Sequence, residues 1–109
     1  MNFRPQRVSN LIREELSLII VREVEFAPGK LITITDVEID KKLDIARVKV
    51  SVLPADYAPQ ALTILAKAAG DLQWKTLKKI NIRPMPRLIF EIDRGLENAA
   101  NVEKLLLDK

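Results

Sequence analysis

The sequence predicts an α+β domain in which helices cover one face of a three-stranded mixed sheet. Three observations predict it. Apolar residues recur with helical periodicity near the start and in the middle of the chain, three short segments are rich in β-branched residues, and a short turn joins the first two of these segments. The 109 residues contain no internal repeat and no linker, so we expect residues 1–109 to form a single domain.

Residues 4–24 are predicted to form an amphipathic helix. Their apolar residues recur at intervals of three and four, which places them on one side of a helix. Pro5 suits the first helical turn, where its missing N–H is not needed. Pro28 and Gly29 then break the chain before the first strand.

Residues 31–39 and 44–53 are predicted to form two strands. The first changes the phase of its alternation near Thr35 and Asp36, which indicates a β-bulge. The second alternates cleanly between small apolar and polar residues. Because the connection that begins at Asp40 is short, the two strands are expected to pair as an antiparallel hairpin.

Residues 60–80 show helical periodicity again, and Pro59 is well placed for the start of a helix. A glycine in the middle of this pattern costs about 1 kcal/mol relative to alanine. We therefore expect two short helices joined by a bend at Ala68, Ala69 and Gly70, rather than one rod.

The last part of the chain is predicted to return to the sheet. Pro84 and Pro86 forbid a helix and favour an extended segment that leads into a third strand at residues 87–93. Residues 96–107 are predicted to form a short final helix. The predicted order is therefore helix, strand, strand, helix, helix, strand and a terminal helix.

Composition limits the classes of function. The chain has no cysteine and no histidine, which removes thiol chemistry and the commonest general base, and it has no phosphate-binding glycine loop. We expect a protein that is not an enzyme and that uses no cofactor, metal or small-molecule substrate. No apolar run resembles a signal peptide or reaches membrane-spanning length, so we expect a cytoplasmic protein without a membrane partner.

The distribution of positive charge predicts a polyanionic partner. The net charge is only +3, but residues 72–90 hold five basic residues and no acidic one. A segregated basic surface is the expected footprint of phosphate binding, although a solvated helix face would give the same pattern. We expect an RNA-binding surface, gathered around the bend at Gly70, that is made of Arg4, Arg7, Lys75, Lys78, Lys79, Arg83 and Arg87.

Two further features have open interpretations. Trp74 could stack on a base, or it could be half-buried packing on an amphipathic helix. Arg47 and Lys49 point away from the apolar residues of their strand, and they could form a solvated sheet face or contact RNA.

Five stretches of the sequence resemble the ribosome-binding factor A family of KH-like proteins. They follow one another in the family's order between residues 3 and 106, at residues 4–8, 32–38, 46–53, 68–70 and 82–90. The resemblance implies a type II KH-like fold. An ordinary KH domain clamps a nucleotide backbone with a GxxG loop, which this sequence lacks. In the family an interrupted helix with an alanine-x-glycine bend replaces that loop, and Ala68, Ala69 and Gly70 fit this pattern.

The resemblance also implies a function. Members bind the free or immature small (30S) ribosomal subunit, contact 16S rRNA and support maturation of its 5′ end, and they matter most during growth in the cold. They catalyse no covalent step, and we expect a monomer. The alternative hypothesis is a small αβ protein-interaction module that acts through its sheet face or a sheet edge.

Overall fold

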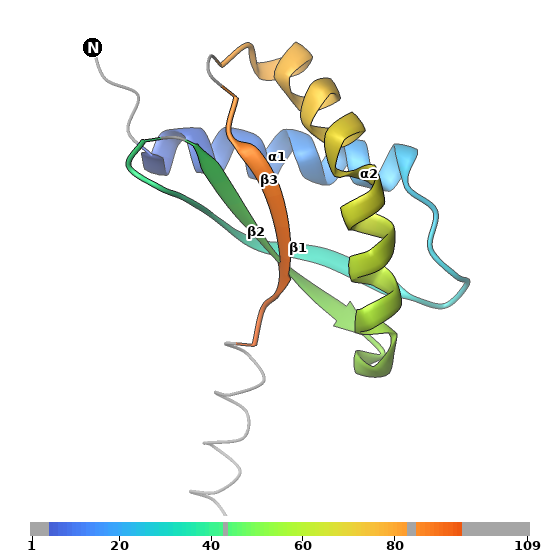
Figure 1. Cartoon of the computed structure of the whole chain (residues 1–109). Helices are drawn as coiled ribbons and strands as arrows, with labels where there is room; N and C mark the ends of the chain where they lie inside the picture. Colours follow the sequence, from blue (N-terminus) through green and yellow to red (C-terminus); the bar gives the residue numbers. More distant parts are fainter. Residues whose placement is uncertain (1–4, 43, 83–84, 95–109) are drawn as a thin grey trace, which may run out of the picture.

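The computed structural model describes residues 5–42, 44–82 and 85–94 of the chain. Its elements are the helices α1 (Pro5–Glu23) and α2 (Ala58–Ile80), the strands β1 (Leu31–Ile39), β2 (Ile45–Leu53) and β3 (Arg87–Ile92), and a short 3-10 helix, η1 (Ala55–Tyr57). Figure 1 shows how these elements are arranged. The predicted α+β class is confirmed, and the predicted final helix, at residues 96–107, lies outside the described residues. Neither α1 nor α2 is long and apolar enough to cross a membrane.

The sheet has β2 at its centre. β1 pairs with it in the antiparallel sense, and β3 pairs with it in the parallel sense, with Arg87 opposite Ile45. The antiparallel register shifts between Ile34 and Asp36, so that Thr35 is the extra residue of a bulge. The predicted hairpin, its bulge and the mixed sheet are therefore confirmed.

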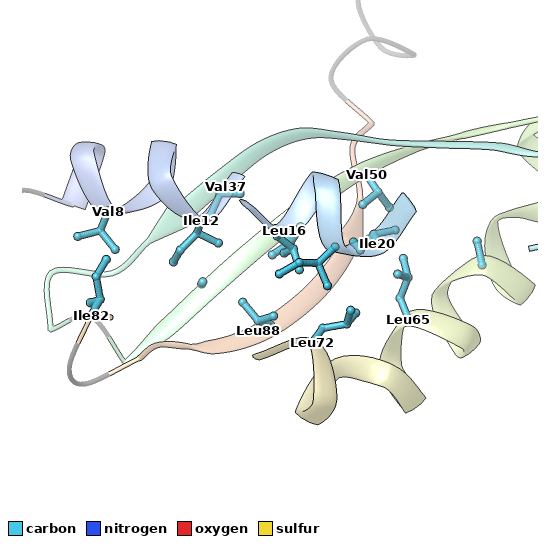
Figure 2. Packing of buried hydrophobic residues seen from close by; sticks show 14 of the residues in the cluster. Val8, Ile12, Leu16, Ile20, Val37, Val50, Leu65, Leu72, Ile82 and Leu88 are labelled. Atoms are coloured by element: carbon cyan, nitrogen blue, oxygen red, sulfur yellow. The ribbon is translucent and has the colours of Figure 1, made fainter. Parts of the chain in front are cut away.

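The alternation along β2 determines which face of the sheet is buried. Its residues Ala46, Val48, Val50 and Val52 are all 6% exposed or less, and they form the floor of the core. Figure 2 shows side chains of α1 and α2 meeting side chains of the strands in this core. The helices cover one face only, because the alternate positions of β2 carry polar side chains such as Arg47 and Lys49.

α2 is one continuous helix from Ala58 to Ile80, so the prediction of two separate short helices is wrong. Gly70 lies in its middle, and the buried residues Leu65 and Leu72 lie on either side. Packing of these leucines on the core offsets the cost of about 1 kcal/mol that glycine brings to a helix. The ribbon of α2 does change direction near its middle in Figure 1, so the predicted bend occurs within a single helix.

The end of α2 is fixed by Asn81, which adopts the left-handed conformation with φ of 51°. Its backbone N–H donates to the carbonyl oxygen of Leu77 at 2.8 Å. Asparagine tolerates this conformation, which commonly terminates helices. The chain then turns back to the core, where Ile82 is buried close to Val8 of α1 (Figure 2).

Candidate RNA-binding surface

Figure 1 shows the start of α1, the turn between β1 and β2 and the start of β3 at one end of the molecule, with the end of α2 above the middle of α1. The Arg87 N–H donates to the carbonyl oxygen of Asp44 at 2.9 Å, which joins β3 to the turn. The carboxylate of Asp40 shapes the same turn, because its Oδ1 accepts two backbone N–H groups at 2.7 and 3.1 Å. These contacts bring Lys41, Lys42 and Arg87 to one end of the sheet, and Lys78 and Lys79 lie at the end of α2, the helix that precedes β3 in the chain.

We name this region the basic end. Its exposed cations are Arg7, Lys41, Lys42, Lys78, Lys79 and Arg87. The sequence predicted all of them except Lys41 and Lys42. These two lysines lie between aspartates, and the pattern of this segment predicts an ordinary turn. No signal in the sequence identifies these two lysines, because only the parallel pairing of β3 places Arg87 beside the start of β2. Two predicted members, Arg4 and Arg83, lie outside the described residues.

Lys75 differs from the other predicted lysines because two carboxylates hold it. Its Nζ lies 2.7 Å from Oε1 of Glu23 and 2.9 Å from Oδ2 of Asp71. The hydrogen bond to Glu23, followed by that to Asp71, raises the pKa of Lys75, and the bond from Lys75 is the main cause that lowers the pKa of Glu23. The charge of Lys75 is therefore compensated by carboxylates of the protein itself.

The two partners of Lys75 differ in whether the sequence could predict them. Asp71 lies four residues before Lys75, and helix geometry makes such a pair neighbours. Glu23 is separated from Lys75 by 52 residues, and only the packing of α1 against α2 brings them together. The prediction that Lys75 binds RNA together with Lys78 and Lys79 therefore did not take the ion pair with Glu23 into account.

Lys78 and Lys79 lie in the last turn of α2 and are exposed. The Nζ of Lys78 lies 5.3 Å from the centroid of the Trp74 ring, within the range of a cation–π contact. Neither lysine forms an ion pair with any residue in the described ranges. Positive charge in a last turn also stabilises the helix through its dipole. Both cations nevertheless face solvent, where an external anion can reach them.

The basic end is centred on the end of α2, not on the bend. Lys78 lies eight residues beyond Gly70, which is about 12 Å along a helix. Gly70 itself is exposed. The cations therefore do not gather around Gly70 as the sequence predicted; they gather where α2 ends and the chain returns to the core.

The cations on the open face of the sheet are paired. The Nζ of Lys49 lies 3.1 Å from Oε2 of Glu38, and the Nε of Arg47 lies 3.6 Å from Oε2 of Glu91. The hydrogen bond to Glu38 is the main cause that raises the pKa of Lys49. Of the two interpretations of Arg47 and Lys49, these pairs favour the solvated sheet face.

A groove of about 730 Å³ lies at the other end of the sheet, where β2 ends and α2 begins. Apolar residues such as Leu53, Pro59 and Leu62 line much of it. It includes none of the residues of the basic end. This apolar groove and the basic end are therefore different places.

The family described as Ribosome-binding factor A matches this chain over residues 4–106. A relative named ribosome-binding factor A from Desulforamulus reducens is 31% identical over 107 residues, which cover 97% of this chain and 89% of the relative. A relative of the same name from Brevibacillus brevis is 32% identical over 104 residues, which cover 94% of this chain and 86% of the relative.

Solved structures show the same fold. The crystal structure of ribosome-binding factor A from Thermus thermophilus superposes with a TM-score of 0.75 at 20% identity, over 85% of this chain and 100% of that one. A homology model of the Thermus thermophilus ribosome-binding factor A, fitted into a cryo-EM map of its 30S complex, gives a TM-score of 0.58 at 23% identity, over 77% of this chain and 93% of that one. With a family match over nearly its whole length, the chain belongs to the ribosome-binding factor A family.

Proposed function

We propose that the protein binds the free or immature 30S ribosomal subunit and that its basic end contacts 16S rRNA. Family membership supports the partner, as does the Thermus thermophilus factor that has been fitted into a map of its 30S complex. The observation that carries the proposal is a difference in pairing. Arg47, Lys49 and Lys75 lie beside carboxylates, whereas Lys78 and Lys79 present their charge to solvent.

The chemistry of such a surface is phosphate neutralisation. Each lysine or arginine that meets a phosphate releases condensed counterions, so the affinity falls steeply with rising salt. Phosphate contacts fix the position of a protein on RNA but do not read its sequence, and the shape of folded rRNA then supplies the selectivity. A chain without histidine or cysteine suits a role in binding without covalent catalysis.

We extend the proposal to support of 16S rRNA 5′-end maturation, most of all in the cold, by a cytoplasmic monomer that needs no cofactor. A protein that binds one RNA conformation more tightly than its competitors shifts the population toward that conformation. Low temperature slows the exchange of RNA structures and stabilises wrong ones, so the same binding energy has its largest effect there.

The test is co-sedimentation of the purified protein with 30S subunits at increasing salt. The double variant K78Q/K79Q removes two cations of the basic end, and R47Q/K49Q removes two paired cations of the sheet. The two variants therefore change the net charge equally. We expect the first to weaken association by about tenfold or more and the second to change it little.

Circular dichroism of both variants establishes that the fold is intact. Equal loss in the two variants would show that net charge alone matters, and it would contradict the proposed surface. The alternative, a protein-interaction module that acts through its sheet face, predicts that R47Q/K49Q is the variant that loses association.

A further inference from the structure

Trp74 is the only tryptophan of the chain, and 57% of its surface is exposed. It lies on α2 close to Leu72, which is buried in the core. Burial of an indole is strongly favourable, so a tryptophan left in solvent gives up stability that packing could supply. Single exposed aliphatic residues such as Leu18 are common on protein surfaces. An exposed indole beside the solvent-facing Lys78 is a more specific arrangement.

The surroundings of Trp74 leave room for a flat ligand. Gly70 lies four residues before Trp74, and residues at this spacing are neighbours on the surface of a helix. A Cβ placed on Gly70 would meet no heavy atom within 4 Å, apart from its chain neighbours and its own helix backbone, among the described residues. The structure therefore gives no steric reason for glycine at this position, and the missing side chain leaves the helix surface open one turn before Trp74.

The charges around Trp74 also favour an anionic ligand. Lys78 lies on the C-terminal side, with its Nζ 5.3 Å from the ring centroid. The carboxylate nearest in the sequence is Asp71, which is 2.9 Å from the Nζ of Lys75. Lys75 thus compensates the negative charge that would otherwise repel a phosphate near the indole. The Lys75–Asp71 ion pair thereby reduces the negative charge near Trp74.

We propose that the exposed indole of Trp74 stacks on one unpaired nucleobase of RNA, while Lys78 and Lys79 bind the phosphates that flank this nucleotide. The inference rests on the proposed function in one respect, that the partner is RNA. Stacking of a base on an aromatic side chain is tolerant of sequence because every base has a flat face. Such a contact would select single-stranded segments of the rRNA over double-stranded ones, where the bases are already stacked.

Trp74 also reports on its own contacts, because no other tryptophan contributes to the fluorescence of the chain. The experiment titrates the full-length protein, at low salt, with a short single-stranded oligoadenylate and with a duplex RNA of the same length. We expect the single strand to quench the indole fluorescence and the duplex to quench it little. Equal quenching by the duplex, or none by saturating single strand, would overturn the stacking.

Variants test the same contact by fluorescence anisotropy of a labelled oligoadenylate. W74A should bind about tenfold more weakly, whereas W74F should retain most of the affinity because phenylalanine also stacks. L18A truncates an exposed apolar residue of α1 and should bind as the unmodified protein does. If W74A and L18A bind alike, the stacking is wrong.

G70M tests the open space without changing Trp74. Gly70 is exposed and an added Cβ meets no heavy atom within 4 Å among the described residues, so the fold should persist in circular dichroism, while quenching and affinity should both fall severalfold. Undiminished quenching in G70M would contradict the proposed position of the base. Failure of these tests leaves the co-sedimentation result of K78Q/K79Q unaffected, so stacking can be rejected while 30S binding stands.

Discussion

The open face of the sheet and the basic end both present lysine and arginine side chains, but they place these side chains in different surroundings. On the sheet, cross-strand neighbours alternate in sign, and Arg47 and Lys49 each lie close to a glutamate. At the basic end, residues 72–90 supply cations from a stretch with no carboxylate, whereas Lys41 and Lys42 have Asp40 and Asp44 as near neighbours in the sequence. A count of cations therefore does not locate an anion-binding surface until the cations held in internal ion pairs have been excluded.

Lys75 shows why the subtraction matters. It belongs to α2 and to the basic stretch of the sequence, yet two carboxylates pair with it, as glutamates pair with Arg47 and Lys49 on the sheet. Exposed pairs of this kind contribute little to stability. Their effect is to remove a cation from the set that can bind phosphate.

Truncation of the residue that anchors the second half of α2 should have the strongest effect. Leu72 is 1% exposed and holds the second half of α2 on the core. L72A should lower the free energy of unfolding by about 3 kcal/mol, the size expected for truncating a buried leucine, as measured by urea denaturation. L18A, at an exposed leucine, should change it by less than about 0.5 kcal/mol. A small effect of L72A would mean that this half of α2 is not docked on the core.

The second prediction compares two lysines of one helix. Lys79 lies in the last turn of α2 and Lys67 in its first half, and both are exposed. K79E should weaken 30S association by about tenfold and reduce the salt dependence by about one counterion, whereas K67E should alter neither. If the two reversals act equally, the basic end is not a local binding surface.

The third prediction concerns the helix that joins the two regions. Gly70 has no positive φ and has open space at its Cβ position, so G70A should stabilise the protein by about 1 kcal/mol in thermal or urea unfolding. Gly29 provides the contrast, since its φ of 79° is strained for alanine and G29A should destabilise. Destabilisation by G70A would indicate that the helix is interrupted there in solution.

The smallest expected effect is the titration of Glu23. Its pKa lies below the ordinary value of 4.5, first because of the hydrogen bond from Lys75 and second because of that from Arg22. A lowered folded-state pKa gives stability that is present above the ordinary value and is lost as the pH falls through the folded value. K75M should raise the pKa of Glu23 toward 4.5, and R22Q should raise it less, as followed by NMR of the side-chain carboxyl. No change in K75M would contradict the pair.

Much of the fold could be predicted because the signals were local. The period of apolar residues located α1 and α2, and the change of alternation at Thr35 located the bulge. The prediction of two helices at Gly70 failed because the packing of Leu65 and Leu72, which holds the helix together, is a tertiary effect.

Less of the site could be predicted from the sequence, because its ion pairs also depend on tertiary packing. The segregated cations after Leu72 were visible in the sequence, and α2 carries Lys78 and Lys79 to its exposed end. Whether a cation is paired depends on residues far away in the chain, as with Glu23 and Lys75. The contribution of Lys41 and Lys42 depends on the parallel register of β3, which periodicity does not reveal.

That parallel register also shapes how the chain can reach its fold. The β1–β2 hairpin needs only neighbouring residues, whereas β3 can join β2 only after α2 has crossed over the sheet. Such non-local pairing is slow compared with hairpin formation. Until it occurs, one edge of β2 stays bare, and the backbone oxygens of Asp44 and Val50 lack the N–H donors of Arg87 and Asp93. A nascent chain that stops short of residue 87 should therefore be prone to edge-to-edge aggregation. The pairing of β3 with β2, which completes the sheet, is also the step that brings Arg87 to its place beside the turn.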